Sequence, residues 1–314
     1  MTFIDWANLT NPIYSYKNWA VKDACMEYKD GIFYLFYSAF YRDRFKIKCH
    51  VVEVSTKDWL TFSKPIFNLS SKEKGWTGLA SPNINKINDK YILTFNSWGN
   101  RHSNKRTNNL FYIESEDLIH WSEMRQVARN LTENIRVIDI AVANENNKFY
   151  VIWKDRDRKR ITKMDRARIA VSHSLDGTFE YIGDGYMKFL LKNGTESSKI
   201  HENFEFIKID GIWYILSTDY RPHRPYLYRI SGTGRGVDDN CWLKWTDGYE
   251  LNIPQEQFNT HDRSNAGFLA DWREYDGHYY LLYAGTTEGR SHARRGDSKL
   301  GLARSNNLLI WNLP

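Results

Sequence analysis

Three cysteines in 314 residues are too few and too far apart for a disulfide-stapled or zinc-binding protein. Cys25, Cys49 and Cys241 form no CxxC pair and no zinc-ligand spacing, so we expect free, buried thiols in a reducing compartment. No apolar run approaches the ~20 residues of a membrane-spanning helix. Residues 1–20 also lack the basic start and apolar core of a signal peptide. We therefore expect a cytoplasmic protein with no membrane partner, or a secreted one if a leader has been removed.

Charge of one sign is not concentrated anywhere in the chain. The 44 lysines and arginines exceed the 38 aspartates and glutamates, which gives a net charge of +6. A basic excess is compatible with nucleic acid or an anionic glycan as partner, but the basic residues are spread out and form no stripe. The densest segment, residues 154–168, is interleaved with acids and is either a solvated hairpin loop or an anion-binding patch. We expect no nucleic-acid partner.

Helical periodicity is nearly absent, whereas aromatic residues make up 15% of the chain, with 12 tryptophans and 20 tyrosines. Residues of this kind favour strands. Five stretches share one plan: a short strand, a turn rich in Gly, Asn or Asp, and a longer aromatic strand. This plan predicts a hairpin in each. The stretches are residues 21–38, 81–97, 139–155, 202–219 and 268–285.

A central tyrosine marks each copy of the repeat and recurs about every 60 residues. The tyrosines are Tyr34, Tyr91, Tyr150, Tyr214 and Tyr280. A polar turn that ends in an aromatic residue follows each of them. Five copies of a four-stranded unit predict an all-β fold, a single five-bladed β-propeller over residues 1–314 with antiparallel blades around a central axis. The expected blades are residues 21–70, 76–128, 135–183, 200–252 and 263–314, and either terminus could complete the last one.

Carboxylates recur at the start of three of these hairpins. Asp23 and Asp139 lie 11 residues before their tyrosines and Glu202 lies 12 before its own, whereas the matching places in the other copies are Leu79 or Ala80 and Phe268 or Leu269. The innermost strands of a propeller line its axis, so the three acids would converge there, and their repulsion would raise at least one pKa. Folding gains nothing from this arrangement, but glycoside hydrolysis needs one protonated and one ionised carboxyl group. The alternative is a structural role, because Asp is common at strand starts.

At these residues the sequence resembles glycoside hydrolase family 43 and its relatives, the five-bladed β-propeller glycosidases. The resemblance is carried by VKDACMEYKDGIFYLFYS, VIDIAVANENNKFYVIWKD and HENFEFIKIDGIWYILSTD, and by turns such as SEDLIHW. It implies a hydrolase that inverts configuration at α-L-arabinofuranosyl or β-xylosyl linkages of plant-type oligosaccharides. Asp23 would be the base that activates water and Glu202 the acid that protonates the leaving oxygen. Asp139 would position Glu202 and raise its pKa.

The sequence departs from the family pattern beside two of the acids. Asp23 is followed by Ala24 where relatives have proline, and Glu202 is followed by Asn203 and Phe204 where they have Gly-Pro. These departures put the substrate in doubt more than the chemistry. The resemblance also implies that His261 binds a water or a calcium ion on the axis. No other cofactor is expected.

Further residues next to predicted strand ends are candidates for binding sugar. Phe40, Trp76, Trp98 and Tyr220 are aromatic residues on which a sugar ring could stack, although core packing is the alternative for each. Arg221 either binds a sugar hydroxyl or carboxylate or is an exposed loop arginine. The expected partner is therefore an oligosaccharide or glycoside. The sequence does not indicate an oligomeric state.

Two other functions stay open at this point. One is a related propeller glycosidase: an exo-hydrolase of anhydro-sugar oligosaccharides like those of family 117, a fructosidase, or a mannoside phosphorylase. Fructosidases are disfavoured because the residues around Asp23 and Asp139 do not match their motifs. The other is a non-catalytic carbohydrate-binding propeller that retains the acids. The surroundings of Glu202 would discriminate, because an exposed and unpaired Glu202 would argue against acid catalysis.

Overall fold

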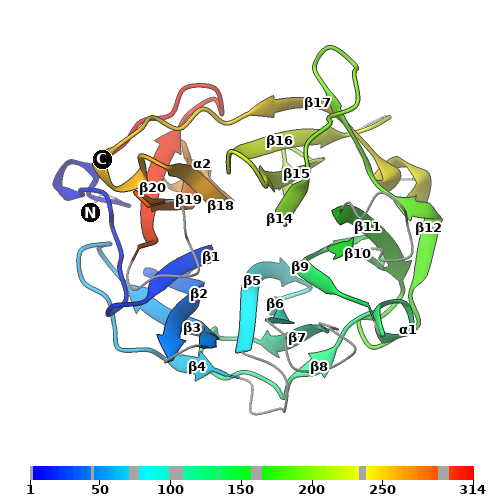
Figure 1. The fold of residues 1–314 in the computed structure, drawn as a ribbon, viewed down its shortest axis with the longest axis horizontal. Coiled ribbons are helices and arrows are strands. Elements are labelled where there is room, and N and C mark those ends of the chain that lie inside the picture. The colour runs from blue at the N-terminus through cyan, green and yellow to red at the C-terminus, as the bar shows by residue number, and fades with distance from the viewer. Residues whose placement is uncertain are drawn as a thin grey trace.

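A computed structural model describes residues 3–43, 46–70, 78–98, 109–133, 135–156, 165–232, 238–288 and 297–314. Strands dominate it and are arranged in a ring around a central space (Figure 1). The prediction of an all-β fold is therefore confirmed. Within the described part of the chain, no helix combines the length and apolar character needed to cross a membrane.

The strands form four hydrogen-bonded sheets. The first contains β1 (Ala20–Lys29), β2 (Ile32–Asp43), β3 (Lys46–Thr56), β4 (Phe67–Leu69), β5 (Gly78–Ile87), β6 (Lys90–Trp98), β7 (Leu110–Ser115) and β8 (Arg125–Gln126). The second contains β9 (Val137–Glu145), β10 (Lys148–Arg156), β11 (Asp165–Ser172) and β12 (Glu180–Tyr186). The third contains β13 (Lys188–Leu191), β14 (His201–Ile209), β15 (Ile212–Asp219), β16 (Pro225–Ile230) and β17 (Lys244–Glu250), and the fourth β18 (Asp262–Trp272), β19 (His278–Thr286) and β20 (Lys299–Ser305).

Helices in the described chain are three to five residues long and lie before the first strand or between strands. They are η1 (Trp6–Asn8), α1 (Arg129–Thr132), η2 (Asp239–Leu243), η3 (Gln257–Asn259) and α2 (Arg273–Asp276). Aromatic side chains fill the spaces between neighbouring groups of strands, which explains their abundance. Tyr150 of β10 stacks on Trp242 of η2, for example, with ring centroids 3.9 Å apart. Rings of this size bury a large apolar area for each residue ordered.

The structure agrees only in part with the predicted division into five four-stranded blades. The eight-stranded sheet consists of two antiparallel groups, β1–β4 and β5–β8, joined at one parallel pair between Cys49 and Gly78. Only glycine fits there, because a β-carbon on Gly78 would lie 1.6 Å from the Cys49 carbonyl oxygen. The third sheet gains β13, which runs parallel to β17, and the last has three strands. The first strands of the groups contact each other in the cyclic order β1, β5, β9, β14, β18 and β1 again (Figure 1).

Both terminal segments flank the last sheet. Tyr14 and Leu300 of β20 exchange backbone hydrogen bonds of 3.4 and 3.0 Å, and Arg304 and Asn312 do so at 3.0 and 2.8 Å. The segment near the N-terminus thus lies where a fourth strand of this group would lie. This agrees with the prediction that a terminus completes the last group.

The five predicted hairpins are present, and four of them close through two residues with positive φ. These turns are Asp30–Gly31, Asn88–Asp89, Asn146–Asn147 and Asp210–Gly211. Two successive positive φ angles define the turn whose twist matches that of paired strands, which explains the Asn, Asp and Gly there. In the fifth hairpin the helix α2 replaces the tight turn and ends at Gly277, with φ of 83°.

The repeated polar turns are built by side chains that bind the backbone. Ser115 Oγ accepts hydrogen bonds from the amides of Asp117 and Leu118 at 3.2 and 2.8 Å, and Asp117 Oδ1 accepts from the next two amides. The pairs Thr56 with Asp58 and Ser305 with Asn307 repeat this pattern. Leu118 is held with φ of 64° and is fully buried. The S-x-D-L motif therefore marks a turn that fixes a core side chain.

Candidate active site

The first strand of each group is interrupted by a bulge near the axis. In each, the pairing with the second strand shifts register, and one residue adopts a positive φ of 49–60°. These residues are Asp23, Ser81, Asp139, Asn203 and Ala266. A bulge turns a side chain away from the regular alternation of a strand. The five bulges thus set which side chains face the axis.

The bulges correct the alignment of the repeats drawn from the sequence. The counterparts of Asp23 and Asp139 are Ser81 and Ala266, not the apolar residues expected, and Glu202 precedes the bulge by one residue. Two local features explain the error. Tyr91 pairs one position closer to its turn than Tyr34 does, and α2 lengthens the fifth hairpin. Two acids, not three, therefore occupy the same place in the repeat.

A cavity of about 720 Å³ opens at this point, and nearly all predicted site residues line it. They are Asp23, Asp139, Glu202, Phe40, Trp98, Tyr220, Arg221 and His261. Trp76 lies outside the described residues. A second cavity of about 20 Å³ is lined by residues of β1, β5, β9, β14 and β18 and shares Asp23 and Asp139 with the first. The side chains expected to meet on one axial space therefore do so.

Asp23 is held by two neighbours that the sequence analysis did not single out. Its carboxylate lies 3.1 Å from the ammonium group of Lys22 and accepts a hydrogen bond of 3.0 Å from Asn203 Nδ2. Only 6% of Asp23 is exposed. One oxygen of this carboxylate is thus fixed by contacts from β1 and β14.

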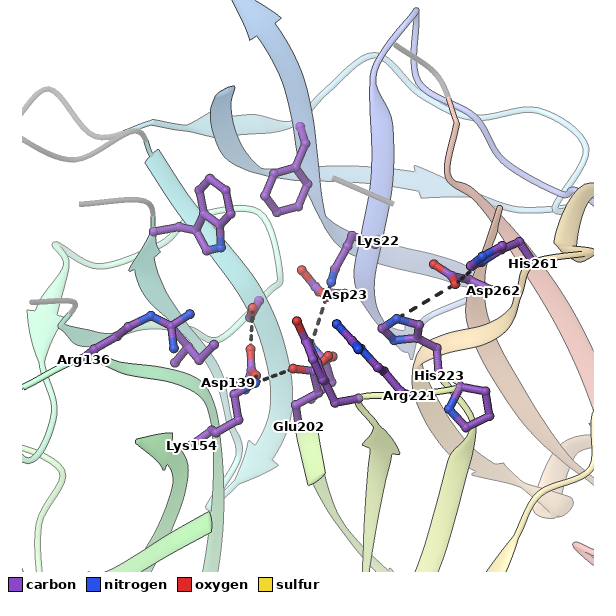
Figure 2. A pocket seen from close by; sticks show the side chains of 17 residues that line it. Lys22, Asp23, Arg136, Asp139, Lys154, Glu202, Arg221, His223, His261 and Asp262 are labelled. Carbon is purple, nitrogen blue, oxygen red and sulfur yellow. Dashed lines mark hydrogen bonds and ion pairs between the residues drawn. The ribbon is translucent and has the colours of Figure 1, made fainter. Parts of the chain in front are cut away.

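Lys154 of β10 joins the two other acids. Its ammonium group donates a hydrogen bond to Glu202 and lies 3.9 Å from Asp139 Oδ2 (Figure 2). Ser81 Oγ donates to Asp139 Oδ1 at 2.9 Å, and the ring of Tyr220 covers the ammonium group at 5.3 Å. Glu202 is neither exposed nor unpaired, so the condition that would have argued against acid catalysis is not met.

Burial and charge move the pKa values of these groups in different directions. Burial raises the pKa of Asp139 to about 6, with the charges of Glu202 and Asp23 adding to the rise and Lys154 opposing it. Burial also raises the pKa of Glu202, but Lys154 and Lys22 outweigh it and hold the pKa below its usual value. The pKa of Asp139 is thus raised and that of Glu202 lowered. This is the reverse of the order that the family resemblance implies.

Lys22 stays charged at neutral pH. Burial lowers its pKa, but the charges of Asp23, Glu202 and Asp139 outweigh burial and raise the pKa above its usual value. Carboxylates and ammonium groups thus balance each other in this part of the cavity. No catalytic motif marks either lysine: Lys22 directly precedes Asp23, and Lys154 is the first residue of the charged segment 154–168, for which a loop or an anion-binding patch was expected.

The three predicted aromatic residues that the structure describes differ in accessibility. Phe40 is only 2% exposed and packs edge-on against Trp98 with ring centroids 5.3 Å apart, so it forms part of the core behind the cavity wall. Trp98 is partly exposed, and Tyr220 is 41% exposed. Trp98 and Tyr220 therefore remain candidates for stacking on a sugar, whereas Phe40 supports the wall.

His261 faces an acid rather than a group of metal ligands. Its Nδ1 lies 2.8 Å from Asp262 Oδ1, and His223 Nε2 lies 3.9 Å from the same oxygen (Figure 2). Calcium takes 6–8 oxygen ligands, yet no cluster of three or more His, Cys, Asp or Glu in the described chain could hold a metal ion. The described side chains alone therefore do not supply the ligands of a calcium ion, and the binding of a water or a calcium ion by His261 stays a prediction.

Solved structures with a similar fold were found, although no family model and no curated protein matches the sequence. An α-L-arabinofuranosidase from Lactobacillus brevis superposes with a TM-score of 0.66 at 12% identity, over 98% of this chain and 97% of that one. The chain has the fold of a glycosidase. A family 43 β-xylosidase/α-arabinofuranosidase from a compost microbial metagenome, solved with xylotriose in calcium-free form, gives 0.63 at 13% over 97% and 96%.

A third solved structure with this glycosidase fold comes from another family. It is from family 130 of mannoside phosphorylases, which contains glycoside hydrolases that target β-1,2-mannosidic linkages in Candida mannan. It gives a TM-score of 0.64 at 13% identity, over 97% of this chain and 94% of that one. At these identities the likeness establishes the fold and leaves the substrate open.

Proposed function

We propose that this protein is a glycoside hydrolase built on a five-bladed β-propeller, with its active site in the axial cavity. The observation that carries the proposal is the meeting of Asp23, Asp139 and Glu202, from three different groups of strands, in one cavity of about 720 Å³. The pKa of Asp139 is raised and that of Glu202 is lowered. Carboxyl groups with pKa values moved apart are what acid–base cleavage of a glycosidic bond requires, and the lowered pKa of Glu202 restricts its action as the acid to acidic pH.

In the proposed reaction Asp23 removes a proton from a water molecule as that water attacks the anomeric carbon. The glycosidic C–O bond breaks, and Glu202 gives a proton to the departing oxygen. The configuration inverts, which requires that acid and base stand about 6.5–9.5 Å apart with the water between them. Asn203 supports the role of Asp23, because its amide leaves the second carboxylate oxygen available to the water.

Lys154 sets the pH at which Glu202 can act as an acid. Lys154 lowers the pKa of Glu202 more than Lys22 does. Because this pKa is below its usual value, protonated Glu202 forms only at acidic pH. We therefore expect the alkaline limb of the kcat/KM profile to lie at acidic pH. Replacing Lys154 with methionine should raise the pKa of Glu202 and move this limb upward by about one unit or more.

The measurement is the pH profile of kcat/KM for wild type, Lys154→Met and Lys154→Arg. The arginine variant keeps the charge and should keep the limb in place. Lys148→Met is the matched control, since Lys148 is on the same strand but pairs with Asp239 outside the cavity. If the alkaline limb of kcat/KM is unchanged in a folded Lys154→Met variant, then Lys154 does not control the pKa of the catalytic acid.

The proposed substrates are α-L-arabinofuranosyl or β-xylosyl linkages of plant-type oligosaccharides. The solved structures of an arabinofuranosidase and of a xylosidase/arabinofuranosidase support this choice through their shared fold, as do the accessible rings of Trp98 and Tyr220. The family 130 structure favours one alternative, a mannoside-cleaving enzyme. A non-catalytic carbohydrate-binding propeller is the other alternative, and the balanced charges around the acids favour it.

The test is a panel of 4-nitrophenyl glycosides that includes arabinofuranosides, xylosides and mannosides, with and without inorganic phosphate. Nitrophenol release from an arabinofuranoside or xyloside is expected. Proton NMR of the first product should show the anomer opposite to that of the substrate. Release from mannosides alone would reassign the substrate. Binding of oligosaccharides without release from any glycoside would identify a carbohydrate-binding protein.

A further inference from the structure

Arg221 presents a positive charge that no described part of the protein neutralises. Four permanent cations line the large cavity: Lys22, Arg136, Lys154 and Arg221. Lys22 is paired with Asp23, Lys154 with Glu202, and Arg136 also has a partner. Arg221 is exposed, as the loop alternative implies; among the described residues it forms no ion pair, and its guanidinium carbon lies 5.5 Å from the ring centre of Tyr220. It points into the cavity (Figure 2).

The loop that carries Arg221 is fixed at several points. Asp219, which is 2% exposed, accepts a hydrogen bond of 3.1 Å from the Arg221 amide through its side chain and one of 3.0 Å from the His223 amide through its carbonyl. Lys199 Nζ donates to the second carboxylate oxygen at 2.6 Å, and the Asp219 amide donates to the Arg224 carbonyl at 2.8 Å. Asp219 therefore ties down the backbone of this loop, so little further ordering is needed when a ligand binds.

His223 gives a second and independent sign of a ligand at this loop. Its backbone adopts φ of 64°, a left-handed conformation that histidine adopts more readily than most residues. Its Nδ1 atom is buried and has no hydrogen-bond partner among the described residues. Buried polar groups are nearly always paired, so one left open in a cavity wall points to a missing partner. Because Nε2 faces Asp262, a neutral ring carries its proton there, and the partner that Nδ1 lacks is a donor such as a sugar hydroxyl. His223 and Arg221 line the same cavity.

We propose that Arg221, with His223 beside it, binds an oxyanion: a carboxylate, sulfate or phosphate group carried by the sugar substrate, or free inorganic phosphate. A guanidinium offers a planar pair of donors that matches such a group, and charge-assisted hydrogen bonds are about twice as strong as neutral ones. Neutral sugar hydroxyls would leave the charge unmatched. If the oxyanion belongs to the sugar, the proposal rests on the proposed function, and the preferred substrate is an acidic glycoside.

The test is calorimetric titration at low ionic strength with matched pairs of ligands. The pairs are D-glucuronate with D-glucose and D-galacturonate with D-galactose, and inorganic phosphate and sulfate are titrated alone. At least one oxyanion should bind wild type, and an acidic sugar should bind about tenfold or more tighter than its neutral counterpart. Arg221→Ala should remove this binding or preference, and Arg221→Lys should retain part of it, because the charge remains without the planar fork.

Arg224→Ala is the matched control, because Arg224 is in the same loop but pairs with Glu250 and does not line the cavity. It should bind as wild type does, and thermal unfolding should confirm that all variants are folded. Binding of uronate but not phosphate assigns the site to the substrate, and the reverse assigns it to free phosphate. Equal binding of acidic and neutral sugars without phosphate or sulfate binding overturns the proposal, as does a preference that survives in Arg221→Ala.

Cleavage activity separates this proposal from the proposed function. A protein that binds an oxyanion through Arg221 but cleaves no glycoside would overturn the proposed function and leave the oxyanion site in place. A protein that hydrolyses neutral xylosides and shows no oxyanion binding would overturn the oxyanion site alone.

Discussion

Replacing Glu202 with glutamine is expected to lower kcat about 10²–10⁴-fold for a glycoside with a poor leaving group, because general-acid catalysis contributes a factor of this size. The loss should be much smaller for a 2,4-dinitrophenyl glycoside, whose leaving group departs without protonation. A purely structural role of Glu202 would affect both substrates alike. The measurement is kcat for wild type and Glu202→Gln with 4-methylumbelliferyl and 2,4-dinitrophenyl glycosides of the sugar that the panel identifies.

Two variants make this prediction specific. Glu205→Gln is the matched control: Glu205 is on the same strand and buried, it accepts a hydrogen bond of 2.7 Å from the Leu269 amide, and it does not line the large cavity. It should leave kcat nearly unchanged for both substrates. Asp139→Asn should lower kcat equally for both. If Asp139→Asn instead shows the dependence on the leaving group, then Asp139 is the acid, as the order of pKa values in the free protein would allow.

The repeat was readable from the sequence because its signals are local. Turn pairs such as Asp210–Gly211 dictate a hairpin wherever they stand between two strand-forming runs, and the aromatic second strands follow from them. Ser115 and Asp117 likewise define a turn through contacts that span only a few residues. Asp23 and Asp139 could be found because each lies at a constant distance from such a turn.

Features that depend on strand register or on contacts between sheets could not be predicted from the sequence. The bulges lie several residues from the turns, so the shifted pairing at Tyr91 and the helix α2 were enough to misplace Ser81 and Ala266. Lys154 meets Glu202 only because the groups that contain β10 and β14 are neighbours in the ring and pack against each other. No spacing along the chain encodes such a contact.

The lysines change what the three acids can do. Without them, the acids would repel one another and all pKa values would rise. Lys154 and Lys22 lower the pKa of Glu202 while that of Asp139 stays raised. The cavity therefore holds both a protonated and an ionised carboxyl group at mildly acidic pH. Which of Asp139 and Glu202 carries the proton depends on Lys154 and Lys22, two cations that the family resemblance does not predict.

Replacing Asp23 with alanine is expected to lower kcat by about 10²–10⁴-fold, and added azide should restore part of the activity. The variant leaves a space beside the ammonium group of Lys22 and the amide of Asn203, which now hold the carboxylate at 3.1 and 3.0 Å. A small anion should bind there and attack the anomeric carbon as the glycosidic C–O bond breaks and the acid protonates the leaving oxygen. The product should be a glycosyl azide of inverted configuration, identified by NMR.

The control variants for azide rescue follow from the same contacts. Asp23→Asn keeps the side-chain volume, leaves no room for azide and should stay inactive when azide is added. Asp271→Ala alters an aspartate that pairs with Arg273 outside the cavity, and it should keep wild-type activity with no response to azide. A folded Asp23→Ala protein that retains wild-type activity would exclude Asp23 as the base. A glycosyl azide of retained configuration would show that attack does not come from the side of Asp23, because a nucleophile bound between Lys22 and Asn203 can reach only one face of the sugar.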